Sequence, residues 1–190
     1  ANQAVAAARL GGNVQMVGKV GFDSFGKELS DNLNKNQVDI SNVRKVKDPT
    51  GTALITVDAK GQNSIIVVPG ANATLTRQDM DALKETIQGA KVLVLQLEIP
   101  LDVVVHAIDI AYESGITILL NPAPATLIPI ETLRKVTFLI PNESELALLS
   151  GIPINNFSDC RKAISHLQSL GCNQIILTRG EHGAYYFYQD

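Results

Sequence analysis

Short apolar runs alternate with longer amphipathic stretches along most of the chain. Several of the short runs are apolar at nearly every position, which is typical of strands covered on both faces. The pattern predicts strands at Val14–Val20, Lys91–Leu97, Ile116–Leu120, Thr137–Ile140, Gln174–Leu177 and Ala184–Tyr188. Besides a helical opening segment, it predicts helices near Phe25–Asn36, Arg77–Gln88, Asp102–Ser114, Glu143–Ser150 and Asp159–Leu170.

The ends of these helices carry residues that favour starting or stopping a helix. Thr76 and Ser158 are expected N-caps, and the expected stops are Gly89, Gly115, Gly151 and Gly171. Strands and helices that alternate in this way predict an α/β fold. Its sheet should be doubly wound and mostly parallel, with helices on both faces.

One region departs from this alternation. Between Val43 and Val68 lie three β-rich runs, "VRKV", "TALITV" and "SIIVV", with no helix between them. The turn-forming cluster Asp58–Asn63 predicts that the last two runs pair as a hairpin. We expect the hairpin to lie outside the main sheet, as a flap or a dimerisation surface. An antiparallel extension of the main sheet is the alternative.

Composition narrows the class of protein. The net charge of −3 over 190 residues offers no basic patch for nucleic acid. The longest apolar runs, such as Val92–Leu97, are far shorter than the ~20 residues of a membrane span. We interpret Cys160 and Cys172 as reduced, half-buried thiols of a cytoplasmic protein, not as a disulfide. The opening "ANQAVAAARLGG" and the final "AYYFYQD" suggest an internal piece of a longer protein.

We looked for candidate site residues directly after each predicted strand, because ligands of open parallel sheets bind beyond the carboxyl ends of the strands. Glu98 is a carboxylate at the end of an apolar run, and it is either solvated or bonded to ligand hydroxyls. Asn142 and Glu145 match a capping box, which could be their whole role or part of one.

Two glycine-containing segments have the same ambiguity. "TRGEHG", from Thr178 to Gly183, suits either a hairpin or a loop whose backbone approaches a ligand. "GFDSFG" is a strand-to-helix turn, capped by Asp23 or Ser24, or a ligand contact. The chain has neither a P-loop lysine nor a GxGxxG motif, which disfavours a nucleotide-binding dehydrogenase. The three histidines, at positions 106, 166 and 182, show no metal-binding spacing.

Taken together, these segments resemble a known family. "ANQAVAAARLGG", "VGKVGFDSFG", "TGTALITVD", "GQNSIIVVPGAN", "LQLEIP", "LNPAPA", "PNESE" and "LTRGEHG" occur in the order found in the ribokinase-like (PfkB) carbohydrate kinases. "NPAPA" together with "QLE" and "PNESE" is most similar to members that act on ribose. The resemblance implies a doubly wound three-layer αβα domain. It also implies a small β-lid over the sugar at residues 43–70, often used as a homodimer contact.

The resemblance also implies an activity and assigns residues to it. The activity is transfer of the ATP γ-phosphoryl group to the 5-hydroxyl of D-ribose. Asn2 and Glu98 match the family's sugar-binding positions. Asn142 matches the asparagine that contacts the nucleotide phosphates, and Glu145 matches the glutamate that organises Mg²⁺, through water. The loop beside the nucleotide corresponds to Thr178, Arg179, Gly180, Glu181, His182 and Gly183.

Parts of the family pattern are not found between Ala1 and Asp190. The Gly-Gly-Lys of the sugar site is expected before Ala1. The Gly-Ala-Gly-Asp segment, with its anion hole and catalytic base, is expected after Asp190, as are any K⁺ ligands. We therefore expect no catalytic base within this chain, and we expect the piece alone to be inactive. A kinase for another sugar or a nucleoside, and a non-catalytic sugar- or nucleotide-binding regulator, remain alternatives.

Overall fold

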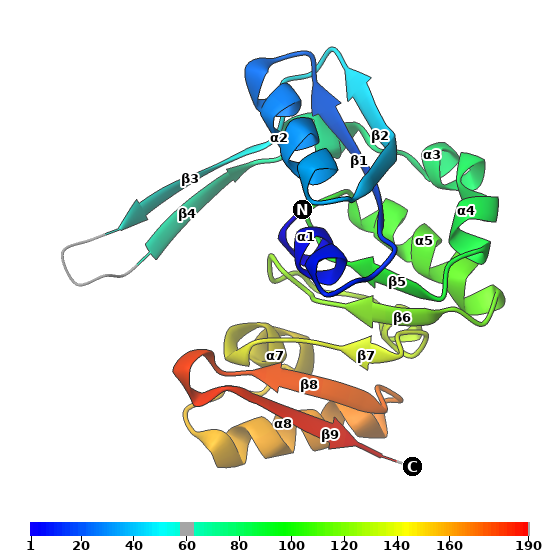
Figure 1. The fold of residues 1–190 in the computed structure, drawn as a ribbon. Helices are drawn as coiled ribbons and strands as arrows, with labels where there is room; N and C mark the ends of the chain where they lie inside the picture. The colour runs from blue at the N-terminus through cyan, green and yellow to red at the C-terminus, as the bar shows by residue number, and fades with distance from the viewer. Residues whose placement is uncertain (58–62, 190) are drawn as a thin grey trace. The chain divides into compact units, whose positions relative to one another are not determined.

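The computed structural model describes residues 1–57 and 63–189 (Figure 1). The chain divides into two compact units, one of residues 1–75 and one that runs from Thr76 to the end. Each unit is described by itself.

The first unit is built around a strand–helix–strand motif. After α1 (Asn2–Arg9), β1 (Gln15–Gly21) and β2 (Asp39–Val46) pair in parallel, and α2 (Ser24–Lys35) connects them. The run "VRKV" is therefore the second half of a longer strand than the sequence predicted. Leu33 and Val38 are buried beside this motif.

The first unit also contains a separate two-stranded sheet. β3 (Thr52–Val57) and β4 (Asn63–Val68) pair antiparallel, from Thr52 opposite Val68 to Val57 opposite Asn63. Among the described residues, this sheet shares no strand pairing with the other two sheets, so the prediction of a hairpin outside the main sheet is confirmed. Residues 58–62 of the predicted turn cluster lie outside the described residues. A short 3₁₀ helix, η1 (Gly70–Thr74), follows β4.

The second unit contains a five-stranded sheet with strand order β5-β6-β7-β8-β9. The strands are β5 (Val92–Leu95), β6 (Thr117–Leu120), β7 (Phe138–Leu139), β8 (Gln174–Thr178) and β9 (Ala184–Tyr188). β5 to β8 are parallel, and β9 is antiparallel to β8. The helices are α3 (Arg77–Ala82), α4 (Lys84–Gln88), α5 (Leu101–Glu113), α6 (Ile130–Leu133), α7 (Glu143–Ser150) and α8 (Phe157–Ser169), with the 3₁₀ helix η2 (Gly180–His182) before β9.

Three details of the helices differ from the sequence predictions. The stretch Arg77–Gln88 is two helices, which meet at Leu83. The N-cap of α8 is Asn156, whose side chain accepts a hydrogen bond from the backbone N–H of Asp159, so the prediction of Ser158 was wrong. Asn is as good an N-cap as Ser, and the local sequence offers both. The four-residue α6 was not predicted.

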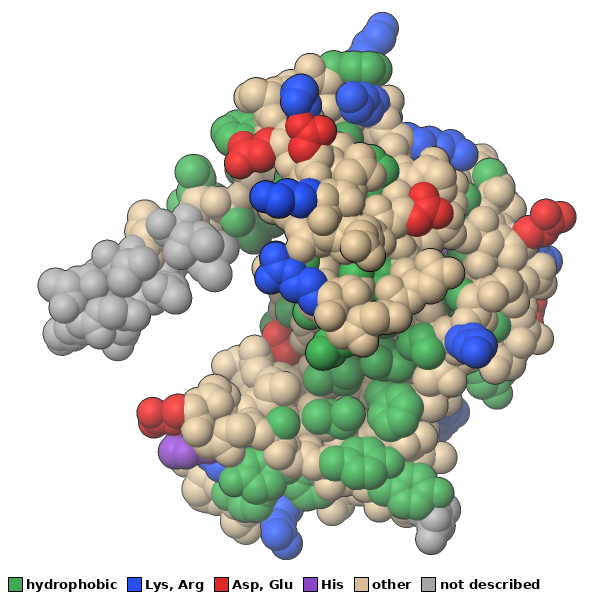
Figure 2. Space-filling view, viewed as in Figure 1, with side chains coloured by type: hydrophobic (Ala, Val, Ile, Leu, Met, Phe, Trp, Pro, Cys, Tyr) green, Lys and Arg blue, Asp and Glu red, His purple; other side chains and the backbone are tan. Residues whose placement is uncertain are grey.

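The two faces of the five-stranded sheet differ in burial. Parallel strands that follow one another in order are joined by right-handed crossovers, which place their connecting helices on one face. The side chains on that face are almost fully inaccessible: Ile118, Leu120, Leu139, Ile175 and Leu177. The registers place Val92, Val94, Tyr186 and Tyr188 on the opposite face, where they are exposed. Figure 2 shows apolar side chains gathered over β9.

The cysteines lie in the core of the second unit. Cys160 and Cys172 are both free, as predicted, but they are fully buried and not half-buried. Burial raises the pKa of the Cys172 thiol to about 11, so this thiol is protonated at neutral pH. Within the described residues, no helix combines the length and the apolar character that crossing a membrane requires.

Candidate sugar and nucleotide site

The carboxyl ends of four parallel strands meet at one edge of the five-stranded sheet. Leu95 is opposite Leu120, which is opposite Leu139 on the next strand. A β-bridge joins Asn142, just beyond the end of β7, to Thr178, the last residue of β8. Glu98, Asn142 and the loop Thr178–Gly183 therefore follow strands of the same sheet at the same edge. Two strand spacings separate β5 from β7, or roughly 10 Å.

Asn142 and Glu145 form a complete capping box at the start of α7. Asn142 Oδ1 accepts from the Glu145 backbone N–H at 2.9 Å, and Glu145 Oε2 accepts from the Asn142 backbone N–H at 2.8 Å. Asn142 Nδ2 also donates to Glu145 Oε1 at 3.0 Å. Glu145 is buried, and burial raises the pKa of its carboxyl group. The capping role of the two residues is thus present in the structure.

The loop from Thr178 to Gly183 is tied to the segment before α7. The backbone N–H of Thr178 donates to Pro141 O at 2.9 Å. At the two ends of the loop, the Arg179 N–H donates to Gly183 O at 2.8 Å. Gly180 and Gly183 have φ values of +53° and +78°, which residues with a Cβ rarely adopt. Glu181 and His182 are exposed between these glycines.

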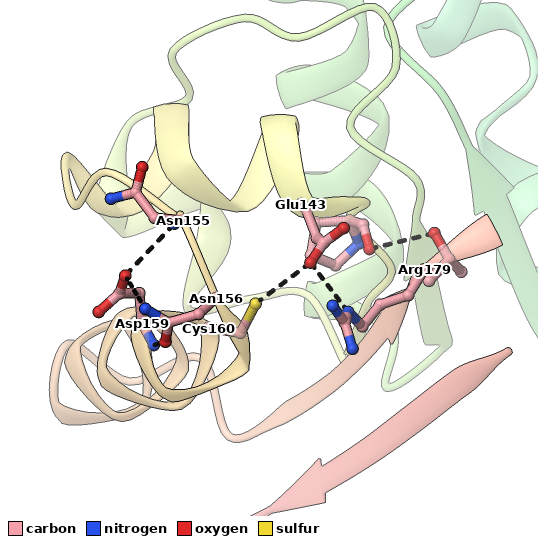
Figure 3. Close-up of polar contacts among 8 residues, drawn as sticks. Glu143, Asn155, Asn156, Asp159, Cys160 and Arg179 are labelled. Atoms are coloured by element: carbon pink, nitrogen blue, oxygen red, sulfur yellow. Dashed lines mark hydrogen bonds and ion pairs between the residues drawn. The ribbon is translucent and has the colours of Figure 1, made fainter. Parts of the chain in front are cut away.

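Arg179 differs from the rest of the loop because its side chain is engaged within the unit. Its Nε donates to Glu143 Oε1 at 2.8 Å, and the same oxygen accepts from the thiol of Cys160 at 3.6 Å. Figure 3 shows Glu143 between Arg179 and Cys160. Glu143 was not among the predicted site residues. Its place directly after Asn142, at the first position of α7, is the only local signal for it.

Glu98 lies in the segment between β5 and α5 and is exposed. The segment is fixed next to it, because the Leu97 N–H donates to Ala123 O at 2.8 Å. Asn121 follows β6 and donates from Nδ2 to Ile140 O at 3.0 Å, which links the ends of β6 and β7. Glu98 is therefore a carboxylate on an anchored backbone at the same edge as Asn142.

Asn2 belongs to the first unit and begins α1. With residues of α1 and α2 it lines a shallow hollow of about 310 Å³, whose other lining residues are Val5, Ala6, Arg9 and Asn32. Its side chain is exposed and polar, as a hydrogen-bonding role toward a sugar requires.

Asp23 has a structural role in the first unit. It is the N-cap of α2, and its carboxylate accepts from Gly26 N–H at 2.8 Å. It also accepts from the Thr50 hydroxyl at 2.6 Å and the Thr50 N–H at 2.7 Å. Between the two sequence alternatives, Asp23 and not Ser24 is the cap.

The described residues contain no group of three or more His, Cys, Asp or Glu side chains that could hold a metal ion. His106 pairs with Asp81 at 2.6 Å, and His166 and His182 lie in α8 and η2. At the sheet edge described above, Glu145 is buried whereas Glu98 and Glu181 are exposed, and both oxygens of Glu145 accept hydrogen bonds from Asn142. This donor set fits a Mg²⁺ ion that keeps its own waters and contacts Glu145 through one of them. It does not fit direct coordination by several carboxylates.

The sequence of the chain matches the family described as "pfkB family carbohydrate kinase" over residues 1–190. The chain belongs to this family. A deoxyribokinase of Salmonella typhi is 41% identical over 192 residues, which cover 100% of this chain and 63% of that protein. A ribokinase of Staphylococcus aureus is 37% identical over 187 residues, or 98% of this chain and 62% of that protein.

A solved structure agrees with this family assignment. The structure of Arabidopsis thaliana ribokinase complexed with ribose and ATP superposes with a TM-score of 0.88 and 32% identity. The match covers 99% of this chain and 62% of that one. The predicted α/β, mostly parallel, ribokinase-like fold is therefore confirmed. The chain spans less than two thirds of the length of these relatives.

Proposed function

We propose that the full-length protein carrying this chain transfers the γ-phosphoryl group of ATP to the 5-hydroxyl of D-ribose. The observation that carries the proposal is the shared edge of the five-stranded sheet. There, Glu98, the Asn142–Glu145 box and the loop Thr178–Gly183 follow strands β5, β7 and β8. A carboxylate suits the hydroxyls of a sugar, and glycine amides with a helix N-terminus suit phosphates.

The proposal gives a part to residues of this edge and to Asn2. Glu98 accepts hydrogen bonds from sugar hydroxyls, and Asn2 of the first unit contributes a further polar contact to the sugar. Asn142 donates to the nucleotide phosphates with the amide hydrogen of Nδ2 that is not directed at Glu145. Gly180 and Gly183 let the backbone of the loop approach the nucleotide, with Glu181 and His182 exposed beside it.

Mg²⁺ would be held near Glu145 through water, and when bound it neutralises negative charge on the phosphates. The residues of this chain bind and orient the substrates, which supplies much of the rate enhancement in phosphoryl transfer. We assign the proton acceptor and the anion hole to the Gly-Ala-Gly-Asp segment that the family carries after the position of Asp190, and any K⁺ ligands to the same region.

We also propose that β3 and β4 form a lid that provides a homodimer contact. Leu54, Ile66 and Val68 are exposed on one face of this two-stranded sheet, and Val67 is exposed on the other. Neighbouring exposed apolar side chains such as Leu54, Ile66 and Val68 are typical of a surface that contacts another molecule. The protein is proposed to act in the cytoplasm, where reduced thiols such as Cys160 and Cys172 are stable.

A second substrate is favoured by a specific observation. The deoxyribokinase of Salmonella typhi is more similar in sequence to this chain than the Staphylococcus aureus ribokinase is. Deoxyribose is therefore the second candidate substrate. It has the same 5-hydroxyl as ribose and lacks only the hydroxyl at carbon 2.

The test is a substrate panel with the full-length protein, Mg²⁺ and ATP. We expect the highest kcat/KM with D-ribose and formation of ribose 5-phosphate. A higher kcat/KM with deoxyribose would assign the second candidate. If ATP is turned over with neither pentose and with no other sugar or nucleoside, the result would instead support a non-catalytic binding regulator.

A further inference from the structure

Three secondary-structure elements hold the side chain of Arg179. Its Nε donates to Glu143 Oε1 at the start of α7, at 2.8 Å. Its guanidinium carbon lies 5.0 Å from the ring centroid of Phe157, at the start of α8, and 5.9 Å from that of Tyr185 in β9. The Phe157 and Tyr185 rings are themselves 4.7 Å apart. The Arg179 side chain is only 16% exposed, so the guanidinium is largely withdrawn from solvent.

The ion pair lies next to a backbone bridge between the same two segments. Thr178 bridges to Asn142, and the next residue along each segment is Arg179 and Glu143 respectively. The side-chain pair therefore continues the connection that the bridge begins. Beyond Arg179 the loop consists of exposed residues, with backbone hydrogen bonds that run between Arg179 and Gly183. The position of this exposed loop relative to α7 thus depends on the bridge and on Arg179.

To reach a bound nucleotide, the Arg179 side chain would have to leave both Glu143 and the two rings. A guanidinium pairs strongly with a carboxylate or a phosphate and stacks on aromatic faces, so a phosphate could replace the Glu143 contact but not the two ring contacts as well. If Arg179 left, the Glu143 carboxylate would lose its ion pair and keep the hydrogen bond from the thiol of Cys160. The arrangement favours a fixed arginine over one that moves to a ligand.

We propose that Glu143 and Arg179 form a latch, and that Arg179 is a positioning residue for nucleotide binding, not a nucleotide contact. The latch sets where the amides of Gly180–Gly183 lie relative to Asn142, so that both segments can engage one phosphate chain. This inference rests on the proposed function, because it concerns how the nucleotide is held.

The test compares Arg179→Met, Glu143→Gln and the double variant in the full-length protein. Arg161→Met is the matched control. The Arg161 guanidinium also stacks on Phe157, at 5.3 Å, but it comes from α8 and not from the loop. The readouts are the Kd for MgATP by calorimetry, the KM for each substrate, and hydrogen exchange of the amides of residues 178–183.

Each single variant is expected to raise the Kd for ATP roughly tenfold and to speed exchange in the loop, because a misplaced binding group loses affinity. The double variant should lose no more than either single one, since both break the same contact. The KM for ribose should be unchanged in all of these variants. Arg161→Met should leave both the Kd for ATP and the amide exchange of the loop unchanged. Arg179→Lys should recover only part of the affinity, because an ammonium lacks the planar fork.

Three outcomes would overturn the latch. A loss of affinity in Arg179→Met but not in Glu143→Gln would make Arg179 a direct nucleotide contact. A lower Tm in both variants with an unchanged Kd for ATP would reduce the pair to a structural one. A wild-type protein that binds no nucleotide would overturn both the proposed function and the latch. This outcome is seen in the wild type alone, whereas the first two outcomes are seen only in the variants.

Discussion

The side chains of Asn142 and Glu145 each accept a hydrogen bond from the backbone N–H of the other residue, at 2.9 Å and 2.8 Å. The pair therefore fixes the N-terminus of α7 where β7 ends. A helix N-terminus attracts anions, so a residue that caps it is also placed to meet a phosphate. The structural role and the proposed role toward the nucleotide are compatible.

Glu145→Gln should lower turnover most at low Mg²⁺. The glutamine keeps an oxygen that can accept from the Asn142 N–H, so the helix start is retained while the negative charge is lost. Turnover measured across a Mg²⁺ titration of the full-length protein checks this. Asp79→Asn is the matched control, because Asp79 completes a second capping box, at α3, for which no ligand role is proposed. An equal loss at every Mg²⁺ concentration would leave Glu145 with capping alone.

Glu98→Ala should raise the KM for ribose roughly tenfold or more, because each hydrogen bond to a carboxylate contributes about 1.5–3 kcal/mol. The KM for ATP should change little. Steady-state kinetics with each substrate varied in turn give both values. Glu113→Ala is the control, since Glu113 is an exposed carboxylate at the end of α5, before β6 begins. Unchanged ribose kinetics in Glu98→Ala would remove Glu98 from the sugar site.

Asp23→Asn should destabilise the protein in a pH-dependent way. The Thr50 hydroxyl, then the backbone N–H groups of Thr50 and Gly26, hold the pKa of Asp23 below its usual 3.8. Because the folded state favours the ionised form, the carboxylate stabilises the fold above the unfolded pKa, and this contribution is lost as pH falls through the folded pKa.

Urea unfolding of wild type and Asp23→Asn between pH 7 and pH 3 measures the effect. The difference in the free energy of unfolding should be constant at the upper end of this range and shrink below about pH 4. A difference that stays the same throughout would show that the charge of Asp23 contributes nothing.

Leu146→Ala should cost roughly 2–5 kcal/mol of stability, as removal of a fully buried leucine does. Leu146 is inaccessible in the core of the second unit, whereas Leu148 in the same helix is 38% exposed. Leu148→Ala is therefore the matched control, and it should cost less than about 1 kcal/mol. Denaturant titrations of both variants give the comparison, and equal costs would contradict the core described for α7.

Much of the fold could be predicted from periodicity. The strands β5 to β9 were located within one to two residues at their ends, because their runs are apolar and bounded by turn residues. Residues Asp39–Asn42 of β2 were missed, since Asp39, Ser41 and Asn42 are polar residues that rarely mark a strand. The N-cap of α8 was wrong by two residues because "NNFSD" offers several capping side chains.

The candidate site was predictable only in part. Residues placed directly after strands, such as Glu98 and Asn142, could be found because topology brings strand ends together. The pairing of Arg179 with Glu143 could not, because 36 residues separate them in sequence and no local pattern specifies it. The same holds for Thr50, which reaches Asp23 from 27 residues away.

The most direct test of the account is a crystal structure of the full-length protein with ribose, Mg²⁺ and a non-hydrolysable ATP analogue. The account predicts sugar hydroxyls within hydrogen-bonding distance of Glu98, and the triphosphate between Asn142 and the loop Thr178–Gly183. A nucleotide bound at the opposite edge of the sheet, for example in the hollow lined by Arg134 and Lys135, would contradict it.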